Sequence, residues 1–132
     1  MLYKVRMTVD LIQVAQHAAD LDRAQAFYTQ LLGSEPLARV DPPGLLFYSL
    51  DGVRLLLDRA APSALLYLRV DNLSSRVDAL RARGVTVDTE PNRIFHHRDD
   101  TLGPADTDEW QAFIRDSEGN LVGLVEQVTS SR

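Results

Sequence analysis

The sequence contains no cysteine, and this absence excludes disulfide bonds, thiolate metal sites and cysteine nucleophiles together. It also has no apolar run close to the roughly 20 residues that a membrane-spanning helix requires. Basic residues are in the minority, with 14 Lys and Arg against 19 Asp and Glu and a formal net charge of −5. Because nucleic-acid binding needs clustered positive charge, we expect the partner to be a small molecule and not nucleic acid. Without a membrane span or a recognisable signal peptide, the expected location is the cytoplasm and no membrane partner is expected.

The motifs of covalent and nucleotide chemistry are missing as well. The seven glycines are spread over turns, so the sequence has no phosphate-binding glycine loop, no dinucleotide fingerprint and no Gly-x-Ser-x-Gly nucleophile motif. Six of the serines fall in helix caps, turns and the C-terminal tail: Ser63, Ser74, Ser75, Ser117, Ser130 and Ser131. Covalent catalysis is therefore not expected.

What the sequence does contain is an internal repeat within a chain long enough for one globular domain. The segment from Asp20 to Gly33, with its Asp-Leu start and its apolar helical spacing, returns as the segment from Asn72 to Gly84. Each copy is too small to bury its own apolar face. We therefore expect a single domain, residues 1–132, built from a pseudo-symmetric pair, with the functional surface between the copies.

The first copy reads as a β-α-β-β-β module over about residues 10–58. Asp20 is placed to cap a helix with one apolar face, and Gly33 is placed to end it. The Asp51-Gly52 pair between two apolar runs predicts a hairpin. Strands are expected at Leu11–His17, Leu37–Val40, Leu45–Leu50 and Val53–Leu57.

The second copy repeats this β-α-β-β-β order over about residues 64–127, after a linker at 59–63. Asn72 is the expected cap of a helix that ends near Gly84. The expected strands are Ala64–Val70, Val85–Val87, Trp110–Arg115 and Leu121–Gln127. The polar segment 88–108 is expected to be a long loop, and hence a lid or a partner contact. Residues 1–9 do not read as a cleaved signal peptide and are an extra strand or an upstream extension.

Three motifs in order resemble the vicinal oxygen chelate superfamily, which includes glyoxalase I, extradiol dioxygenases, and fosfomycin-resistance and bleomycin-resistance proteins. The motifs are Asp20-Leu21-Asp22-Arg23-Ala24 with Phe27-Tyr28, Val70-Asp71-Asn72-Leu73 with Leu80 to Val85, and Phe113-Ile114-Arg115-Asp116 with Glu118-Gly119-Asn120. The resemblance implies an α+β fold in which two tandem βαβββ modules form a mixed-sheet cup. It also implies a homodimer.

In the metal enzymes of that family the first and last strand of each module carry one ligand each. The resemblance places these four positions on Gln13, Leu55, Leu65 and Gly123. Three of these residues have no side-chain donor, and a glutamine carbonyl alone is a weak ligand for a divalent metal. No metal cofactor is therefore expected. Glu126, close after Gly123, is either a solvated strand-end residue or a candidate base.

The three histidines do not form an obvious metal site. His96 and His97 are adjacent, and neighbouring residues on an extended segment point to opposite sides, so they are not expected to share an ion with Asp99, Asp100 or Asp106. His97 is a candidate acid–base residue in the polar loop. His17 reads as an exposed residue at the end of the first strand.

An apolar pocket is the other candidate site. If Leu65 faces the cup, strand alternation places Tyr67 on the same face, and Leu55, Leu57 and Trp110 would complete the lining. Such a surface suits a small molecule, but the same residues could fill a core or a subunit interface. The acidic run Asp106, Asp108 and Glu109 is either a solvated loop or, beside Trp110, an attractor for a cationic ligand.

Three functions follow from these observations. The first is a metal-free small-molecule-binding protein that sequesters a cationic or aromatic compound. The second is a lyase, isomerase or dioxygenase-like enzyme with a displaced metal site or with acid–base chemistry from Glu126 or His97. The third is a protein-interaction module that uses the polar loop.

Overall fold

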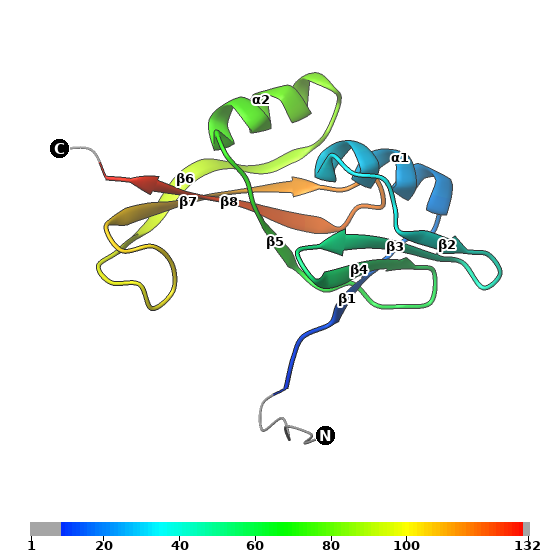
Figure 1. Ribbon diagram of the computed structural model, residues 1–132. Helices are drawn as coiled ribbons and strands as arrows, with labels where there is room; N and C mark the ends of the chain where they lie inside the picture. The colour runs from blue at the N-terminus through cyan, green and yellow to red at the C-terminus, as the bar shows by residue number, and fades with distance from the viewer. Residues whose placement is uncertain (1–8, 131–132) are drawn as a thin grey trace, which may run out of the picture. The chain divides into compact units, whose positions relative to one another are not determined.

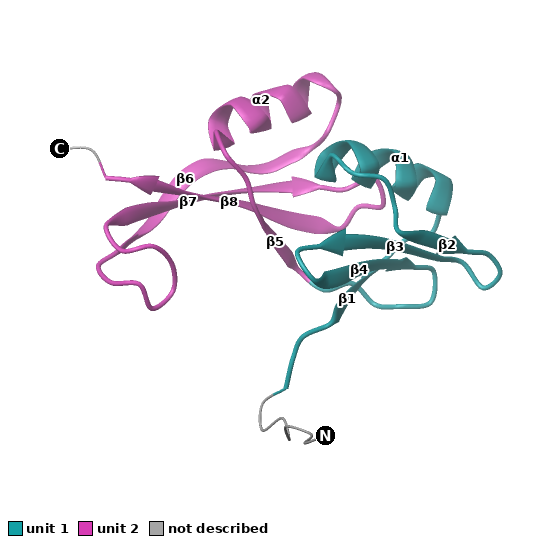
Figure 2. Cartoon of the chain, viewed as in Figure 1, with its two compact units in different colours: residues 1–64 teal, residues 65–132 magenta. Residues whose placement is uncertain are grey.

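The computed structural model describes residues 9–130 and divides the chain into two compact units, with the boundary between Ala64 and Leu65 (Figure 2). The first unit contains β1 (Gln13–His17), α1 (Leu21–Leu32), β2 (Ala38–Val40), β3 (Leu45–Leu50) and β4 (Val53–Asp58). The second contains β5 (Leu66–Arg69), α2 (Leu73–Ala82), β6 (Val87–His97), β7 (Thr107–Arg115) and β8 (Leu121–Thr129). The extra strand or extension considered before Val9 lies outside the described residues.

Both units have the same topology, so the expected α+β fold of two tandem βαβββ modules is confirmed. The strand orders are β1-β4-β3-β2 and β5-β8-β7-β6. In each sheet the first strand of the module runs parallel to its neighbour, which is the last strand of the module in sequence: β1 pairs with β4, and β5 pairs with β8. Within each unit the helix lies over one face of its own sheet (Figure 1). Each sheet therefore has one face covered by its helix and one that this helix leaves open. Within residues 9–130 no helix has the length and apolarity that crossing a membrane demands.

Helix α1 begins and ends where the sequence predicts. The Asp20 carboxylate accepts a hydrogen bond from the Arg23 amide at 3.1 Å, which satisfies one of the free N–H groups at the helix start. Gly33 adopts a left-handed conformation with φ of 70° and donates its N–H to the Thr29 carbonyl. The apolar face of the helix, including Leu21 and Tyr28, is fully buried.

The face of the first sheet under α1 is the core of that unit. Leu55 pairs with Tyr48 across the strands, and both are buried. The Tyr48 hydroxyl shares a hydrogen bond of 2.8 Å with the Thr29 hydroxyl of α1. Leu57 is fully buried on the same face. Of the two roles considered for Leu55 and Leu57, the structure gives the core and not the lining of a cup: Gln13 pairs with Arg54, so Leu55 falls on the face opposite Gln13.

Gln16 is a polar residue in this core. It pairs with Leu57 on β4 and is 0% exposed. Neither its side-chain nitrogen nor its side-chain oxygen has a hydrogen-bond partner in the part of the chain that the structure describes. A buried amide without partners loses its hydrogen bonds to water on folding, so Gln16 lowers the stability of the first unit.

We expect Gln16→Met to raise the free energy of unfolding by about 1.5 kcal/mol, because it removes the desolvation penalty of the amide and nearly conserves the volume. Urea unfolding followed by circular dichroism measures the change. The exposed Gln30 of α1 supplies the matched control, since Gln30→Met is expected to change stability by less than about 0.5 kcal/mol. A lower unfolding midpoint for Gln16→Met would contradict the interpretation.

Helix α2 is capped differently from the prediction. Asn72 stands at the N-cap position but has a left-handed backbone, with φ of 55° and ψ of 59°, and its side chain makes no capping hydrogen bond. An N-cap side chain usually works from an extended backbone, which Asn72 does not have. The cap comes instead from β8: the Glu126 carboxylate accepts from the Asn72 amide at 2.9 Å and from the Leu73 amide at 3.0 Å.

The prediction of a long loop at 88–108 is wrong for about half of that segment. Residues Val87–His97 form β6, which pairs antiparallel with β7 across three register shifts. This strand is polar because it is the edge of the sheet and most of its residues are exposed, and an edge also tolerates Pro91. The loop that remains comprises residues 98–106.

Candidate functional site

The face of the second sheet that α2 leaves uncovered carries an aromatic pair. We call this face the open face of the second unit. Tyr67 on β5 and Phe113 on β7 are both register neighbours of Gly123 on β8, so the three residues lie side by side on it. Leu65, just before β5, and Tyr67 are 46% and 54% exposed. This face therefore presents apolar and aromatic surface to solvent.

Gly123 is what allows the two rings to meet. The centroids of the Tyr67 and Phe113 rings are 5.8 Å apart, with an interplanar angle of 74°, an edge-to-face geometry that aromatic pairs favour. A Cβ at position 123 would lie 2.8 Å from the Tyr67 ring and 3.0 Å from the Phe113 ring. Gly123, which the family resemblance places at a metal-ligand position, thus leaves room for the aromatic pair of Tyr67 and Phe113.

A polar group lies on the same face, two residues along β7 from Phe113. We call it the Glu109 cluster: His97, Glu109, Gln111 and Gln127. The Glu109 carboxylate contacts His97 Nε2 at 2.8 Å and accepts hydrogen bonds from the side-chain amides of Gln111 at 2.9 Å and Gln127 at 3.4 Å. The side chains of His97 and Glu109 are only 2% and 13% exposed.

The electrostatics of the Glu109 cluster keep the carboxylate ionised. Burial acts to raise the pKa of Glu109, but the hydrogen bonds from His97, Gln111 and Gln127 outweigh it and hold the pKa below its ordinary value. The open face of the second unit therefore carries a partly buried negative charge next to aromatic surface. The sequence left Glu109 either in a solvated loop or as an attractor for a cationic ligand. A strand that starts at Thr107 aligns Glu109, Gln111 and Phe113 on one face.

The 98–106 loop covers the histidine of this cluster. A Cβ at Gly103 would lie 2.9 Å from both His97 Cε1 and Gln127 Nε2, so the loop backbone approaches these side chains closely. His97, the candidate acid–base residue, is consequently buried behind Gly103.

His96 points to the other face of the sheet, which confirms that the adjacent histidines diverge. Its Nδ1 contacts the Asp108 carboxylate at 2.9 Å, and Arg93 lies 3.3 Å from the same oxygen. The hydrogen bond with His96 lowers the pKa of Asp108. Asp106 lies 3.6 Å from His96 Nε2. Across residues 9–130, no three His, Cys, Asp or Glu side chains gather into a group that could hold a metal ion.

Two further residues with predicted roles in the site lie on the helix-covered side of the second sheet. Trp110 is the register neighbour of Glu126, and Glu126 contacts the start of α2 through both of its carboxylate oxygens. Trp110 therefore does not share a face with Tyr67, and the predicted common lining is wrong, because Trp110 and Phe113 are three positions apart on β7 and so point to opposite faces. Glu126 acts as a helix cap in this structure.

The open face of the first unit carries Gln13, but with an arginine beside it. The Arg54 Nε donates a 2.9 Å hydrogen bond to the side-chain oxygen Oε1 of Gln13, and the guanidinium lies 5.9 Å from the Phe47 ring centroid. A guanidinium repels a divalent cation, and the amide oxygen that could have ligated one is already engaged. The residues at Gln13, Leu55, Leu65 and Gly123 therefore do not fit the metal of the family's enzymes.

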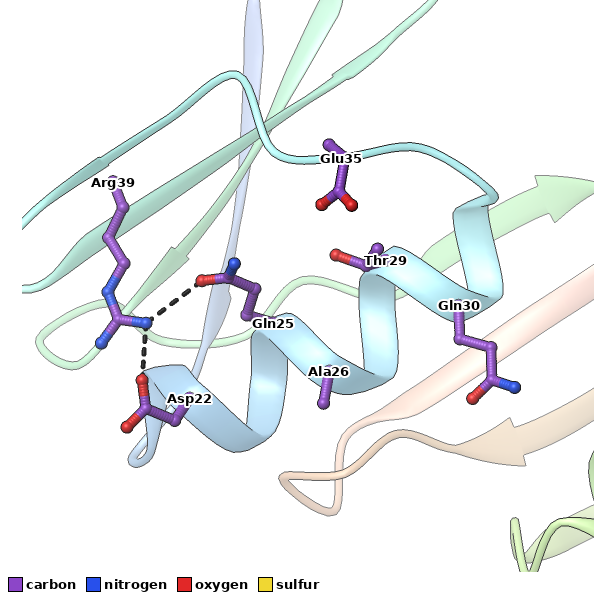
Figure 3. Close-up of a pocket in the computed structure, with 7 residues that line it drawn as sticks. All are labelled: Asp22, Gln25, Ala26, Thr29, Gln30, Glu35 and Arg39. Carbon is purple, nitrogen blue, oxygen red and sulfur yellow. Dashed lines mark hydrogen bonds and ion pairs between the residues drawn. The ribbon is translucent and has the colours of Figure 1, made fainter.

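A separate groove of about 560 Å³ lies between α1 and the segment leading into β2 (Figure 3). Figure 3 shows Arg39 reaching across it, with hydrogen bonds of 2.7 Å to Asp22 and 3.1 Å to Gln25. The hydrogen bond with Asp22 raises the pKa of Arg39. Because the cation in this groove is already neutralised within the unit, the groove offers less to a ligand than the open sheet faces do.

Comparison with known proteins places the fold. Residues 11–124 match the model of the Glyoxalase/Bleomycin resistance protein/Dioxygenase superfamily. The similar solved structures include TnmS3, an antibiotic-binding protein from Streptomyces sp. CB03234, at 23% identity and a TM-score of 0.70, covering 93% of this chain and 99% of that one. UcmS2 has 25% identity and a TM-score of 0.67, with 90% and 98% covered. Lactoylglutathione lyase from Agrobacterium tumefaciens has 22% identity and a TM-score of 0.61, with 90% and 94% covered. No curated protein matches the sequence.

Proposed function

The chain belongs to the Glyoxalase/Bleomycin resistance protein/Dioxygenase superfamily, and from that premise we propose that it is a small-molecule-binding protein that sequesters an aromatic compound without a metal ion. The observation that carries the proposal is the pair formed by the exposed Tyr67 and the half-buried Phe113 over Gly123. An antibiotic-binding protein among the similar structures supports the same class of function.

The geometry suits a flat aromatic ligand with a hydrogen-bonding or cationic end. Its ring would pack on Tyr67 and Phe113, where aromatic contacts add to the burial of apolar area. Successive residues on one face of a strand are about 7 Å apart, so Gln111 and the ionised Glu109 follow Phe113 at a distance that a drug-sized molecule spans. A few polar anchors beside an apolar floor are what orient ligands in small-molecule sites.

An enzymatic function has less support from the geometry. General acid–base catalysis needs a proton-transfer group within hydrogen-bond reach of the substrate. Both oxygens of Glu126 are engaged by α2, and the His97 side chain is 2% exposed and covered at Gly103. These contacts favour binding over a lyase, isomerase or dioxygenase-like reaction. The proposal retains the homodimer that the resemblance implies, and light scattering measures it.

Titration calorimetry with a panel of planar aromatic antibiotics and bleomycin tests this function. We expect at least one compound to bind in the presence of EDTA, and Tyr67→Ala to weaken it about tenfold through lost aromatic contact and buried area. Gly123→Ala is expected to weaken it as well, because the new Cβ pushes the two rings apart.

The exposed Leu37 of the first unit provides the control, since Leu37→Ala removes exposed apolar surface far along the chain from the aromatic pair and should leave the affinity unchanged. Equal losses in Tyr67→Ala and Leu37→Ala would contradict the assignment of the site. No binding by any compound of the panel would contradict the function.

A further inference from the structure

The open face of the first unit carries a polar row across three neighbouring strands. Gln13 on β1 pairs with Arg54 on β4, and Arg54 pairs with Ser49 on β3. Directly paired residues share a face of the sheet, so an amide, a guanidinium and a hydroxyl lie in line. We call these three residues the Arg54 row.

Arg54 is held in place while part of it remains available. Its Nε is fixed on Gln13, and its guanidinium lies near the Phe47 ring. Its two terminal nitrogens have no hydrogen-bond or ion-pair partner within residues 9–130. A guanidinium positioned in this way presents a planar fork of N–H donors that matches the two oxygens of a carboxylate.

An apolar row runs beside the Arg54 row. Ala15 pairs with Leu56, and Leu56 pairs with Phe47. Leu56 is 7% exposed, whereas Ala15 and Phe47 on either side are partly exposed. The two rows are about 7 Å apart, which is close to the distance from a carboxylate carbon to the far edge of an attached two-ring aromatic group such as naphthyl.

The acidic group on this face does not neutralise the arginine. Asp58 lies one row beyond Leu56 on β4, and its carboxylate accepts a 2.8 Å hydrogen bond from the Ala60 amide. The Arg54 row thus keeps a net positive charge, which is the opposite of the anionic Glu109 cluster on the second unit.

We propose that the open face of the first unit binds an organic anion of the aromatic carboxylate class. The carboxylate pairs with the terminal nitrogens of Arg54 and with the Ser49 hydroxyl, and the ring lies on Phe47 and Ala15. This is a second site that prefers an anionic ligand. The proposal does not depend on ligand binding at Tyr67.

The test compares 2-naphthoate with 2-naphthamide, which share their ring and differ in charge, by titration calorimetry at pH 7. We expect the wild type to bind the carboxylate about tenfold more tightly than the amide, because a bidentate charge-assisted pair is available only to the carboxylate. Arg54→Met is expected to abolish this preference. Arg54→Lys is expected to retain part of it, because lysine keeps the positive charge but lacks the planar pair of N–H donors.

Arg76 on α2 is a matched control, since it is an exposed arginine on the other unit, and Arg76→Met should keep the preference. Tyr67→Ala should also keep it, which separates this site from the one under Proposed function. Substitutions of exposed side chains rarely change stability by more than about 0.5 kcal/mol, so the variants are expected to fold.

Amide chemical shifts in two-dimensional NMR locate the ligand. We expect 2-naphthoate to perturb Gln13, Ser49 and Arg54 in the wild type and not in Arg54→Met. Equal affinity for the carboxylate and the amide, an unchanged preference in Arg54→Met, or shifts confined to the second unit would each overturn the proposal.

Discussion

Glu109→Ala is expected to lower the free energy of unfolding by about 3 kcal/mol, since it removes the carboxylate from a largely buried hydrogen-bonded cluster and leaves its partners unsatisfied. The Glu109 carboxylate contacts His97 at 2.8 Å and accepts from Gln111 and Gln127. The His97 side chain is only 2% exposed, so water cannot readily replace the lost contact. The substitution should also destabilise the 98–106 loop, because Gly103 of this loop packs closely on His97 and Gln127.

Urea unfolding monitored by Trp110 fluorescence measures this effect, because Trp110 is the residue next to Glu109 and the chain has one tryptophan. Glu109→Gln keeps the shape and one acceptor and should cost about 1 kcal/mol. Asp100→Ala removes an exposed carboxylate of the neighbouring loop and should cost less than about 0.5 kcal/mol. Equal stabilities of Glu109→Ala and Asp100→Ala would show that the cluster does not contribute.

The same contacts make part of the stability depend on pH. The pKa of Glu109 is lower in the folded state than its ordinary value, so the unfolded chain takes up this proton first as the pH falls. The contribution is fully present above the unfolded pKa of about 4.3 and is lost as the pH falls through the folded pKa. The difference in unfolding free energy between wild type and Glu109→Gln should therefore shrink on acidification. A difference that stays constant would contradict this linkage.

Glu126→Ala is expected to lower the free energy of unfolding by about 2 kcal/mol, because it removes two charge-assisted hydrogen bonds from the start of α2. The carboxylate contacts the amides of Asn72 and Leu73 at 2.9 and 3.0 Å, where the helix dipole also favours a negative charge. Asn72 cannot compensate, since its own side chain makes no capping bond.

Hydrogen exchange of the amides in the first turn of α2 gives a local measure of this loss. We expect faster exchange in Glu126→Ala and an intermediate rate in Glu126→Gln, which keeps one acceptor without the charge. The exposed Glu35 of the first unit serves as the control, and Glu35→Ala should leave the exchange of α2 unchanged. Unaltered exchange in Glu126→Ala would contradict the capping role.

The elements that depend on local signals could be predicted from the sequence. The helix from Asp20 to Gly33 was recognisable because its cap, apolar spacing and terminal glycine act within a few turns. The hairpin at Asp51-Gly52 followed from turn chemistry alone, and β3 and β4 flank it as expected. The divergence of His96 and His97 needed only the two-residue period of a strand.

The errors concern which residues face each other across strands. Leu55 was considered for the same cup as Gln13, but β1 pairs Gln13 with Arg54, so Leu55 lies on the opposite face and in the core; one step of register exchanges the two faces of a strand. Residues 88–97 read as a loop because an edge strand has few buried positions to show a pattern. Glu126 looked like a strand-end carboxylate, since the helix start that it caps is distant in sequence.

The sequence by itself determined the repeat, the helices, the turns and the poor fit of Gln13, Leu55, Leu65 and Gly123 to a metal. These properties reside in residue types and short spacings, which act before the chain has a tertiary structure. Only the tertiary structure decided that Tyr67 meets Phe113 over Gly123, that Glu109 meets His97, and that Arg54 stands beside Gln13. Each of these contacts depends on strand register, which is set by the packing of a whole sheet against its helix.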